Sequence, residues 1–309
     1  MINTSEPRQQ IDVVIPAFNA AAFITQTLES VAIQGNLIGQ VIVVNDGSLD
    51  DTVALVTQFA KAHPFMNLRL ISQTNAGLSA ARNTGIANAR AQWIAFLDAD
   101  DIWLPFKLSK QYALFAASSD PKLGLVYSGY GLITENSQPI PNPRGLILPH
   151  LKGSVYRQLK KGNFISGSGS AVMIKKTVFD RVGLFDEALP ACEDWDMWLR
   201  ITKEFHIDYV PLELVHIRLH ANNMQKDFKR MLSADLMVLN KFSIACETNV
   251  FLLWKIRTIL FAKKIRPDSI AGFSSCTPQL QQQLTGLRYA LACLILAPLH
   301  WAGSHYLNK

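Results

Sequence analysis

The sequence predicts an α/β protein with a mostly parallel sheet flanked by helices, followed by a C-terminal helical appendage. Two observations support this fold class. From residue 11 to about residue 118, apolar runs of strand type alternate with segments of helical periodicity. After residue 226, the composition shifts to helix formers with basic and apolar clusters. Strands that alternate with helices at this spacing are typical of βαβ units, which build parallel sheets.

The elements follow from the pattern in chain order. Apolar runs predict strands at 11–18, 40–44, 68–72 and 93–97. Helical spacing predicts helices at 20–34, 50–63 and 78–90, with another from Pro105 to about residue 118. Three later strands are expected at 123–127, 171–175 and 215–219, and an irregular loop at 135–153. The regular alternation is lost in this second half, so we expect the sheet there to be mixed.

Length and charge limit the possible partners. The 309 residues suffice for a domain at 1–225 and a helical region at 226–309. The net charge of +6 favours anionic partners, such as nucleotides or an acidic membrane surface. No basic stripe interleaves with aromatic residues in the motif-bearing region, so nucleic-acid binding is not expected.

The cysteines and the N-terminus predict a cytoplasmic protein. Cys192, Cys246, Cys276 and Cys293 show no Cys-x-x-Cys spacing and no regular framework. They are typical of reduced thiols in a reducing compartment. The polar segment Met1–Gln10 lacks the apolar core of an export signal.

The C-terminal region leaves two interpretations open. Segment Phe251–Arg266 mixes basic and apolar residues, which fits a helix lying on the cytoplasmic face of a membrane or one packed on the domain. Segment Tyr289–Leu299 is apolar but shorter than the roughly 20 residues that a spanning helix needs. An interfacial segment and a buried helix are both expected ahead of a spanning one.

An acidic turn is the most informative feature for function. The strand at 93–97 ends in Asp98, Asp100 and Asp101, at the place where open α/β sheets bind ligands. Clustered carboxylates repel each other unless a cation lies among them. Oxygen ligands suit Mg²⁺ or Mn²⁺, which commonly bridge to substrate phosphates. A solvated turn that caps the next helix is the alternative for so short a pattern, and the neighbouring motifs argue against it.

Three segments fit a nucleotide beside this turn. Phe18 ends the first strand, where its ring can stack on a nucleobase. Asp46 closes the second strand and can accept the imide N–H of uracil. Gly77 permits close backbone approach, and the helix beyond it offers N–H groups to anions. Arg82, one turn into that helix, can contact phosphate or base.

Two further segments supply acid–base and metal candidates. Three acids stand within Glu193-Asp194-Trp195-Asp196, and a carboxylate in an aromatic setting is a candidate general base. The alternative is that these acids favour a helix dipole. His220 follows the last strand and can complete a metal shell or touch a diphosphate; a surface histidine is the alternative.

Five motifs in order resemble family 2 glycosyltransferases of the GT-A fold over residues 11–220. They are Pro16-Ala-Phe18-Asn19, Asn45-Asp46-Gly47-Ser48, Gly77 with Ala81-Arg82-Asn83, Asp98-Ala-Asp100-Asp101 and Glu193-Asp194. The resemblance implies an inverting transferase that takes a nucleotide-sugar donor and a divalent cation, Mn²⁺ or Mg²⁺.

The resemblance, together with the residue patterns outside the five motifs, leads to expected residue roles. Asp194 is expected as the catalytic base. Asp100 and His220 are the expected metal ligands. The expected nucleotide-sugar contacts are Pro16, Phe18, Asn19, Asp46, Gly77, Arg82, Asp98 and Ala99. The expected acceptor side comprises Glu193, Trp195 and Gly167.

Departures from the family pattern affect donor choice. Phe18 stands where the family usually has Tyr, and Asn45 where it usually has Asp. The Gln-x-x-Arg-Trp motif of processive synthases is absent, so a single addition per encounter is expected. The expected partners are a nucleotide-sugar donor, with a UDP-sugar favoured, and a glycan or lipid-linked acceptor in cell-envelope polysaccharide synthesis.

Two other functions fit the sequence less well. One is a non-catalytic sugar-nucleotide-binding or assembly protein of the same fold, against which the complete set of acids argues. The other is a dinucleotide oxidoreductase. It would need Gly-x-Gly-x-x-Gly after the first strand, where Pro16-Ala-Phe18-Asn19 stands instead.

Overall fold

The structure is a computed structural model that describes residues 11–141 and 147–244. The chain divides into two compact units. The first contains the residues up to 159, together with 163–188 and 193–221, and the second contains 160–162, 189–192 and the chain from 222 onward. The expected division into a domain at 1–225 and a helical region at 226–309 stays a prediction. The region beyond residue 244, including Phe251–Arg266 and Tyr289–Leu299, lies outside the described residues.

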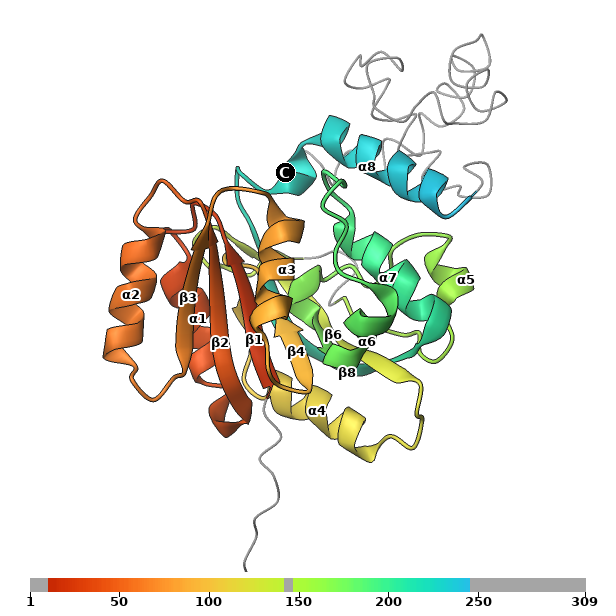
Figure 1. Ribbon diagram of the computed structural model, residues 1–309, viewed down its shortest axis with the longest axis horizontal. Helices are drawn as coiled ribbons and strands as arrows, with labels where there is room; N and C mark the ends of the chain where they lie inside the picture. Colours follow the sequence, from red (N-terminus) through yellow and green to blue (C-terminus); the bar gives the residue numbers. More distant parts are fainter. Residues whose placement is uncertain (1–10, 142–146, 245–309) are drawn as a thin grey trace, which may run out of the picture. The chain divides into compact units, whose positions relative to one another are not determined.

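Figure 1 shows the strands and helices of each unit. The strands of the first unit are β1 (Ile11–Ala17), β2 (Ile38–Asp46), β3 (Leu68–Gln73), β4 (Trp93–Phe96), β5 (Ile102–Trp103), β6 (Leu123–Thr134), β7 (Val172–Lys175) and β8 (His206–Leu219). Its helices are α1 (Ile24–Ala32), α2 (Thr52–Ala62), α3 (Leu78–Asn88), α4 (Lys107–Ala117), α5 (Tyr156–Leu159), α6 (Lys176–Val182) and α7 (Glu193–Glu204), with 3-10 turns η1 (Gly35–Leu37) and η2 (Gly169–Ala171). The second unit contributes η3 (Met224–Lys226) and α8 (Phe228–Lys241).

One sheet organises the first unit. Its strand order is β3-β2-β1-β4-β7-β6-β8-β5. The four strands from β3 to β4 are mutually parallel, as the βαβ pattern predicts. β7 runs antiparallel to both β4 and β6, so the sheet is mixed beyond β4. Both expectations, a parallel first half and a mixed second half, are confirmed.

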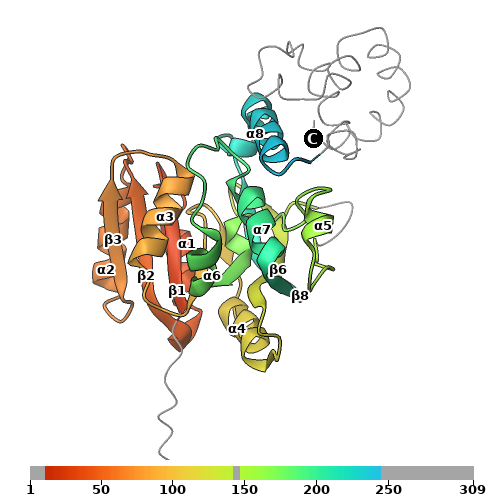
Figure 2. The same cartoon turned by 45° about the vertical axis from the view of Figure 1, so that its right-hand side comes forward.

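Helices cover both faces of the sheet. Ile11, Val13 and Ile15 of β1 belong to a core cluster that also contains residues of α1, α2 and α4. Val14 points to the other face, where α3 approaches so closely that a Cβ at Gly85 would clash with the Val14 side chain. Figures 1 and 2 show α1 and α3 on opposite faces of the parallel strands.

β6 and β8 extend much further than the sequence predicts. They pair in parallel from Leu123 to Thr134, with register shifts on either side of Gly129. A Cβ at Gly129 would come within 2.8 Å of the Leu212 carbonyl oxygen, which explains a glycine at this position. Glycine inside a strand weakens the apolar pattern, so the sequence did not predict this long pairing. It matters because it carries the end of β8 to the edge where β4 ends.

The expected irregular loop at 135–153 is only partly described, since residues 142–146 lie outside the structure's described part. Its remaining residues form isolated bridges such as Ile133 with Pro139 and Tyr130 with Ile147. Within residues 11–141 and 147–244, no helix is long and apolar enough to span a membrane.

The second unit begins its helix with a capping aspartate. Asp227 Oδ1 accepts the Arg230 N–H at 3.0 Å, which satisfies one of the open N–H groups at the start of α8.

Cys192 is a buried thiol whose Sγ donates to Asp235 Oδ1 at 3.3 Å, and it forms no disulfide. The thiol state expected for the cysteines is therefore confirmed at this position, and the other three lie outside the described residues.

Candidate active site

The candidate site residues gather where the parallel strands end. Phe18 and Asn19 follow β1, Asp46 ends β2, and Asp98 comes two residues after β4. Since these strands are parallel, their carboxyl ends meet at one edge of the sheet. The edge predicted to bind a ligand is thus built from the predicted segments.

The loops after β1 and β2 are joined by hydrogen bonds. Asn19 adopts a left-handed conformation, with φ of 49°. Its backbone N–H donates to Ser48 Oγ at 3.0 Å, and its Oδ1 accepts the Leu49 N–H at 2.8 Å. This arrangement leaves the ring of Phe18 51% exposed. Pro16 lies within β1, whose residues are all buried, and its expected contact with the nucleotide sugar stays a prediction.

Asp46 supports the turn that precedes α3. Its Oδ1 accepts the Ala76 N–H at 2.9 Å and the side-chain amide of Gln73 at 2.8 Å. Its Oδ2 accepts the Gly77 N–H at 2.8 Å, and Gly77 has a φ of +94°, which favours glycine. The Asp46 carboxylate is buried and accepts three hydrogen bonds, so it holds the turn before α3 in place. A contact between Asp46 and a nucleobase stays a prediction.

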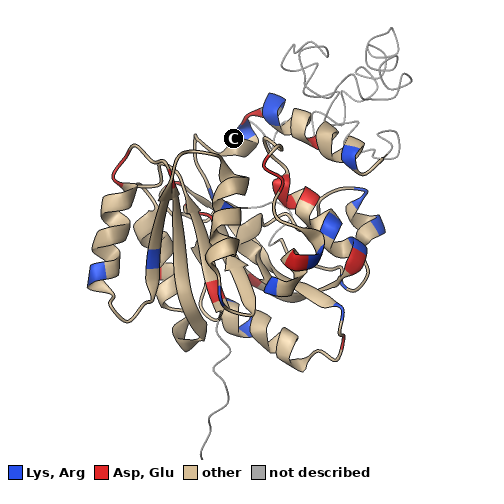
Figure 3. Ribbon diagram, in the orientation of Figure 1, with Lys and Arg blue, Asp and Glu red and all other residues tan. Residues whose placement is uncertain are grey.

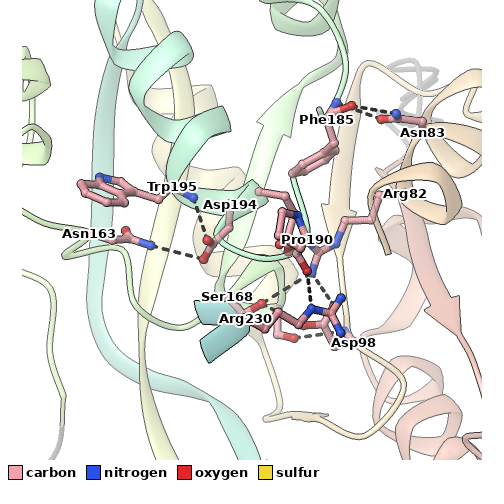
Figure 4. Close-up of polar contacts among 12 residues, drawn as sticks. Arg82, Asn83, Asp98, Asn163, Ser168, Phe185, Pro190, Asp194, Trp195 and Arg230 are labelled. Atoms are coloured by element: carbon pink, nitrogen blue, oxygen red, sulfur yellow. Dashed lines mark hydrogen bonds and ion pairs between the residues drawn. The ribbon is translucent and has the colours of Figure 1, made fainter. Parts of the chain in front are cut away.

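Arg82 joins two distant acids through ion pairs. Its Nη2 lies 2.7 Å from Asp98 Oδ1, and its Nη1 lies 2.7 Å from Glu193 Oε1. Figure 4 shows the pairing with Asp98. The guanidinium is fully buried above the Phe185 ring, at 5.3 Å from the centroid. Gly169 leaves room for it, because a Cβ there would come within 3.1 Å of Nη2.

The charges around Arg82 keep it ionised. Burial alone lowers the pKa of Arg82, but the charges of Asp98 and Glu193 outweigh this effect and raise the pKa. Both terminal nitrogens of the guanidinium form ion pairs with carboxylates, and Glu193 is itself buried. A direct contact of Arg82 with a nucleotide, or of Glu193 with an acceptor, stays a prediction and would require this ion-pair network to open.

The segment before β7 supports Asp98 from the other side. Ser168 Oγ donates to Asp98 Oδ2 at 2.8 Å, and the Asp98 N–H donates to Ser170 Oγ at 3.0 Å. Ser168 has a φ of +52°, which is strained for a non-glycine residue. Gly167 is buried, and a Cβ there would clash with Ala171, so packing explains this glycine. Its expected place on the acceptor side stays a prediction.

Buried partners hold the acidic turn rigid. Thr27 Oγ1 of α1 donates to the carbonyl oxygens of Ala99 and Asp101, both at 2.9 Å. Arg218 Nε donates to the Asp100 carbonyl at 2.8 Å, and the Arg218 N–H donates to Asp101 Oδ1 at 3.0 Å. Burial, together with the charges of the other two acids, raises the pKa of Asp101 well above its usual range. Asp101 is therefore a structural residue, and the buried Ala99 takes part through its backbone.

Asp100 and His220, the two expected metal ligands, lie side by side. His220 Nε2 is 2.8 Å from Asp100 Oδ2, and both side chains are partly exposed. The His220 ring also lies against Phe23, with ring centroids 5.0 Å apart. Among the described residues, no group of three or more His, Cys, Asp or Glu side chains is arranged to hold a metal ion. A carboxylate and an imidazole fit a divalent cation whose remaining ligands are phosphate oxygens and water.

Asp194 lies in the first turn of α7, where Figure 3 shows the acidic residues in red. Its Oδ1 accepts the Trp195 N–H at 2.7 Å, and its Oδ2 accepts the side-chain amide of Asn163 at 3.3 Å (Figure 4). Burial and the charge of Glu193 raise the pKa of Asp194 to about 7, although the charge of Arg82 opposes the shift. A carboxylate with this pKa can accept a proton near neutral pH.

Trp195 belongs to the core rather than to an exposed surface. Its side chain is 4% exposed, and its indole N–H donates to the Leu159 carbonyl at 2.9 Å. This burial favours a packing role, and acceptor contact by Trp195 stays a prediction. No role was predicted for Asn163 from the sequence, whereas the Gly-Ser-Gly-Ser segment at 167–170 was expected to line the acceptor side, which stays a prediction.

The fold and the site define a GT-A type α/β protein with acids at the carboxyl ends of its parallel strands. Residues 12–183 match the family described as Glycosyl transferase family 2, which is more than half of the chain. The chain therefore belongs to glycosyl transferase family 2. The family expected from the five motifs is confirmed.

Sequence relatives support the same assignment. An "Uncharacterized glycosyltransferase" of Rickettsia felis is 27% identical over 229 residues, which are 70% of this chain and 35% of the relative. The "Putative teichuronic acid biosynthesis glycosyltransferase TuaG" of Bacillus subtilis is 30% identical over 130 residues, 42% of this chain and 50% of the relative. In the Rickettsia felis protein and two other Rickettsia relatives, the matched region spans about a third of the relative's length.

Solved structures confirm the expected GT-A fold. S. aureus TarS 1–349 in complex with UDP-GlcNAc superposes with a TM-score of 0.61 at 17% identity, covering 89% of this chain and 77% of that one. The mannosyltransferase PcManGT from Pyrobaculum calidifontis, in complex with GDP-Man and Mn²⁺, gives a TM-score of 0.59 at 19% identity, covering 94% and 80%.

Removing the Arg82 charge should destabilise the protein strongly. We expect Arg82→Met to lower the free energy of unfolding by about 3–5 kcal/mol, because it leaves Asp98 and Glu193 partly or fully buried without their cation. Urea denaturation measures this change. In the control, Arg181→Met breaks the exposed pair with Glu204 and should cost about 0–1 kcal/mol. Equal effects of the two variants would contradict the structural role of Arg82.

Proposed function

We propose that this chain transfers a sugar from a nucleoside-diphosphate donor to an acceptor hydroxyl, with inversion at the anomeric carbon. The observation that carries the proposal is the Asp98–Arg82–Glu193 ion-pair network. It connects the acidic turn that bears Asp100 to the helix turn that bears Asp194. A cation-binding side and a proton acceptor are thus parts of one rigid framework.

The chemistry follows from this division of roles. Asp194 takes the proton from the acceptor hydroxyl while that oxygen attacks C1 of the donor sugar. The bond from C1 to the phosphate oxygen breaks in the same step, and the nucleoside diphosphate leaves with the bonding electrons. Attack from the face opposite the leaving group inverts C1. A glycosidase needs a second carboxyl group to protonate its leaving oxygen, whereas a diphosphate can leave as an anion.

Asp100 and His220 would hold a divalent cation, Mn²⁺ or Mg²⁺, together with the donor diphosphate. Such an ion supplies Lewis-acid neutralisation of the leaving group's charge. PcManGT, which shares the fold, is described in complex with GDP-Man and Mn²⁺. This neighbour supports the proposed use of a cation.

Donor and acceptor are proposed at the level of chemical class. The exposed Phe18 ring offers a stacking face for the base, which can contribute about 1–3 kcal/mol. A UDP-sugar is favoured, and TarS with UDP-GlcNAc supports this choice. The name of TuaG supports an envelope-polysaccharide acceptor, either a glycan or a lipid-linked glycan. The expected attachment to the cytoplasmic membrane surface rests on segments outside the described residues and stays a prediction.

Asp194→Asn should abolish transfer while leaving donor binding intact. The amide keeps the shape of the side chain but cannot take the acceptor proton, so kcat should fall by about 10²–10⁴-fold. Initial rates with a UDP-sugar and its acceptor measure this effect. Asp208→Asn is the matched control, because Asp208 Oδ1 also accepts the N–H of the next residue, at 2.8 Å. Full activity of Asp194→Asn would remove Asp194 from the role.

The pH profile should report the protonation of Asp194. The ionised carboxylate is the active base, so kcat/KM should be highest above pH 7 and should fall as the pH drops through about 7. In Glu193→Gln, one of the charges that raise the pKa of Asp194 is lost, so the acidic limb should move to lower pH. Steady-state rates from about pH 5 to about pH 9 test this. If the acidic limb of the kcat/KM profile stays in place or moves to higher pH in Glu193→Gln, the assignment of Asp194 as the base is contradicted.

Asp100→Ala should abolish the cation-dependent binding of the donor. In the unaltered protein, UDP-, GDP- and dTDP-sugars tested with Mn²⁺ should raise Tm in the order of their affinities, because a ligand that binds the folded state stabilises it. With EDTA, and in Asp100→Ala with Mn²⁺, most of this Tm shift should disappear. Asp208→Asn should keep it. A Tm shift in Asp100→Ala as large as in the unaltered protein would argue against Asp100 as a ligand.

A further inference from the structure

One short segment contacts both acidic centres of the site. We call residues 163–168 the connecting segment. At one end, the Asn163 side-chain amide donates to Asp194 Oδ2 at 3.3 Å. At the other end, Ser168 Oγ donates to Asp98 Oδ2 at 2.8 Å. Figure 4 shows both contacts in one view. The connecting segment therefore parallels the Arg82 link between the acidic turn and α7.

The orientation of the Asn163 amide is fixed by its own turn. Its Oδ1 accepts the Ile165 N–H at 3.1 Å, so the amide oxygen faces the backbone and the NH₂ group faces Asp194. Ile165 is fully buried, which anchors the turn. Asn163 therefore presents a donor to the carboxylate in a defined direction.

The far end of the connecting segment is equally well anchored. The Ala171 N–H donates to the Gly167 carbonyl at 3.2 Å, and Gly167 is packed against Tyr130 and Ala171. Ser168 keeps its strained left-handed conformation while it is bonded to Asp98. With both ends held, the position of Asn163 is coupled to the same framework that holds Asp98.

The two oxygens of Asp194 accept hydrogen bonds from different partners. Oδ1 is occupied by the N–H of Trp195 in its own helix, at 2.7 Å. Oδ2 accepts the longer of the two bonds, at 3.3 Å, and has a second lone pair that can meet the acceptor hydroxyl. The hydrogen bond from Asn163 restricts the rotation of the carboxylate. A donor to a carboxylate also favours its ionised form.

The charged groups around Asp194 show why such a donor matters. Glu193 and Asp98 disfavour the ionised carboxylate, and Arg82 favours it. Arg82 interacts with Asp194 through its charge, while its own hydrogen bonds go to Asp98 and Glu193. Asn163 supplies a side-chain hydrogen bond directly to the carboxylate.

We propose that Asn163 is a positioning residue that fixes Oδ2 of Asp194 toward the acceptor and favours its ionised form. The inference rests on the proposed function, since it takes Asp194 as the base. Asn163 acts through Asp194 and takes part in no bond making or breaking itself.

The test uses the full chain and three variants. In Asn163→Ala the donor is lost, and in the near-isosteric Asn163→Asp a negative charge replaces it. We expect kcat to fall about tenfold or more in both variants with donor KM changed less than about twofold. The acidic limb of kcat/KM should move to higher pH, further in Asn163→Asp than in Asn163→Ala. Asn67→Ala is the control, since the exposed Asn67 donates its amide to the Gly39 carbonyl, and it should leave rates and limb unchanged.

Each result decides the inference. Unchanged kcat in both variants, or a lower kcat with an unmoved pH limb, would overturn the positioning role. Should Asn163→Ala prove poorly folded by thermal denaturation, the rates and pH limb of the near-isosteric Asn163→Asp decide on their own. Failure of the proposed function looks different, because Asp194→Asn would then remain active. An inactive Asp194→Asn beside normal Asn163 variants would overturn the inference alone.

Discussion

The buried Arg82 guanidinium is the interaction on which the rest of the site depends. Asp98 and Glu193 are 95 residues apart in the chain, and both direct a carboxylate to the same cation, at 2.7 Å each. Burying such charges costs free energy that their attraction only partly returns, so the gain is in geometry more than in stability. With the acidic turn and the start of α7 fixed to one guanidinium, Asp194 has little freedom to move relative to Asp98.

The three acids of the turn take different roles because their surroundings differ. Asp98 faces Arg82 and Ser168, while Asp101 faces buried donors and has a raised pKa. Asp100 is left beside His220 and partly exposed. Like charges so close together cannot all remain ionised at no cost. The fold resolves this conflict by pairing Asp98 with a buried cation, burying Asp101 among donors, and leaving Asp100 partly exposed beside His220.

The sequence predicted which residues gather at the site more reliably than it predicted where their side chains point. Strand periodicity predicted which edge collects Phe18, Asp46 and Asp98, since parallel strands leave few alternatives. The motif at Arg82 indicated function but not that the side chain points into the core, because burial depends on distant partners such as Glu193. Because Gly129 interrupts the apolar pattern, the sequence did not predict the long pairing of β6 and β8. This pairing brings His220 to the edge of the sheet where the parallel strands end. Asn163 lies in no motif, so its contact with Asp194 could be found only in three dimensions.

Glu193 lies next to the proposed base Asp194 and changes its strength as a base. A carboxylate with an ordinary pKa near 4 is a weak base toward a sugar hydroxyl. Burial and Glu193 raise the pKa of Asp194 to about 7, which makes it a stronger base while it remains ionised near neutral pH. Without an opposing charge, the same environment would raise the pKa of Asp194 further and favour its protonated form. Arg82 provides that opposition while it neutralises Glu193, so one buried cation both sets the geometry and limits the shift.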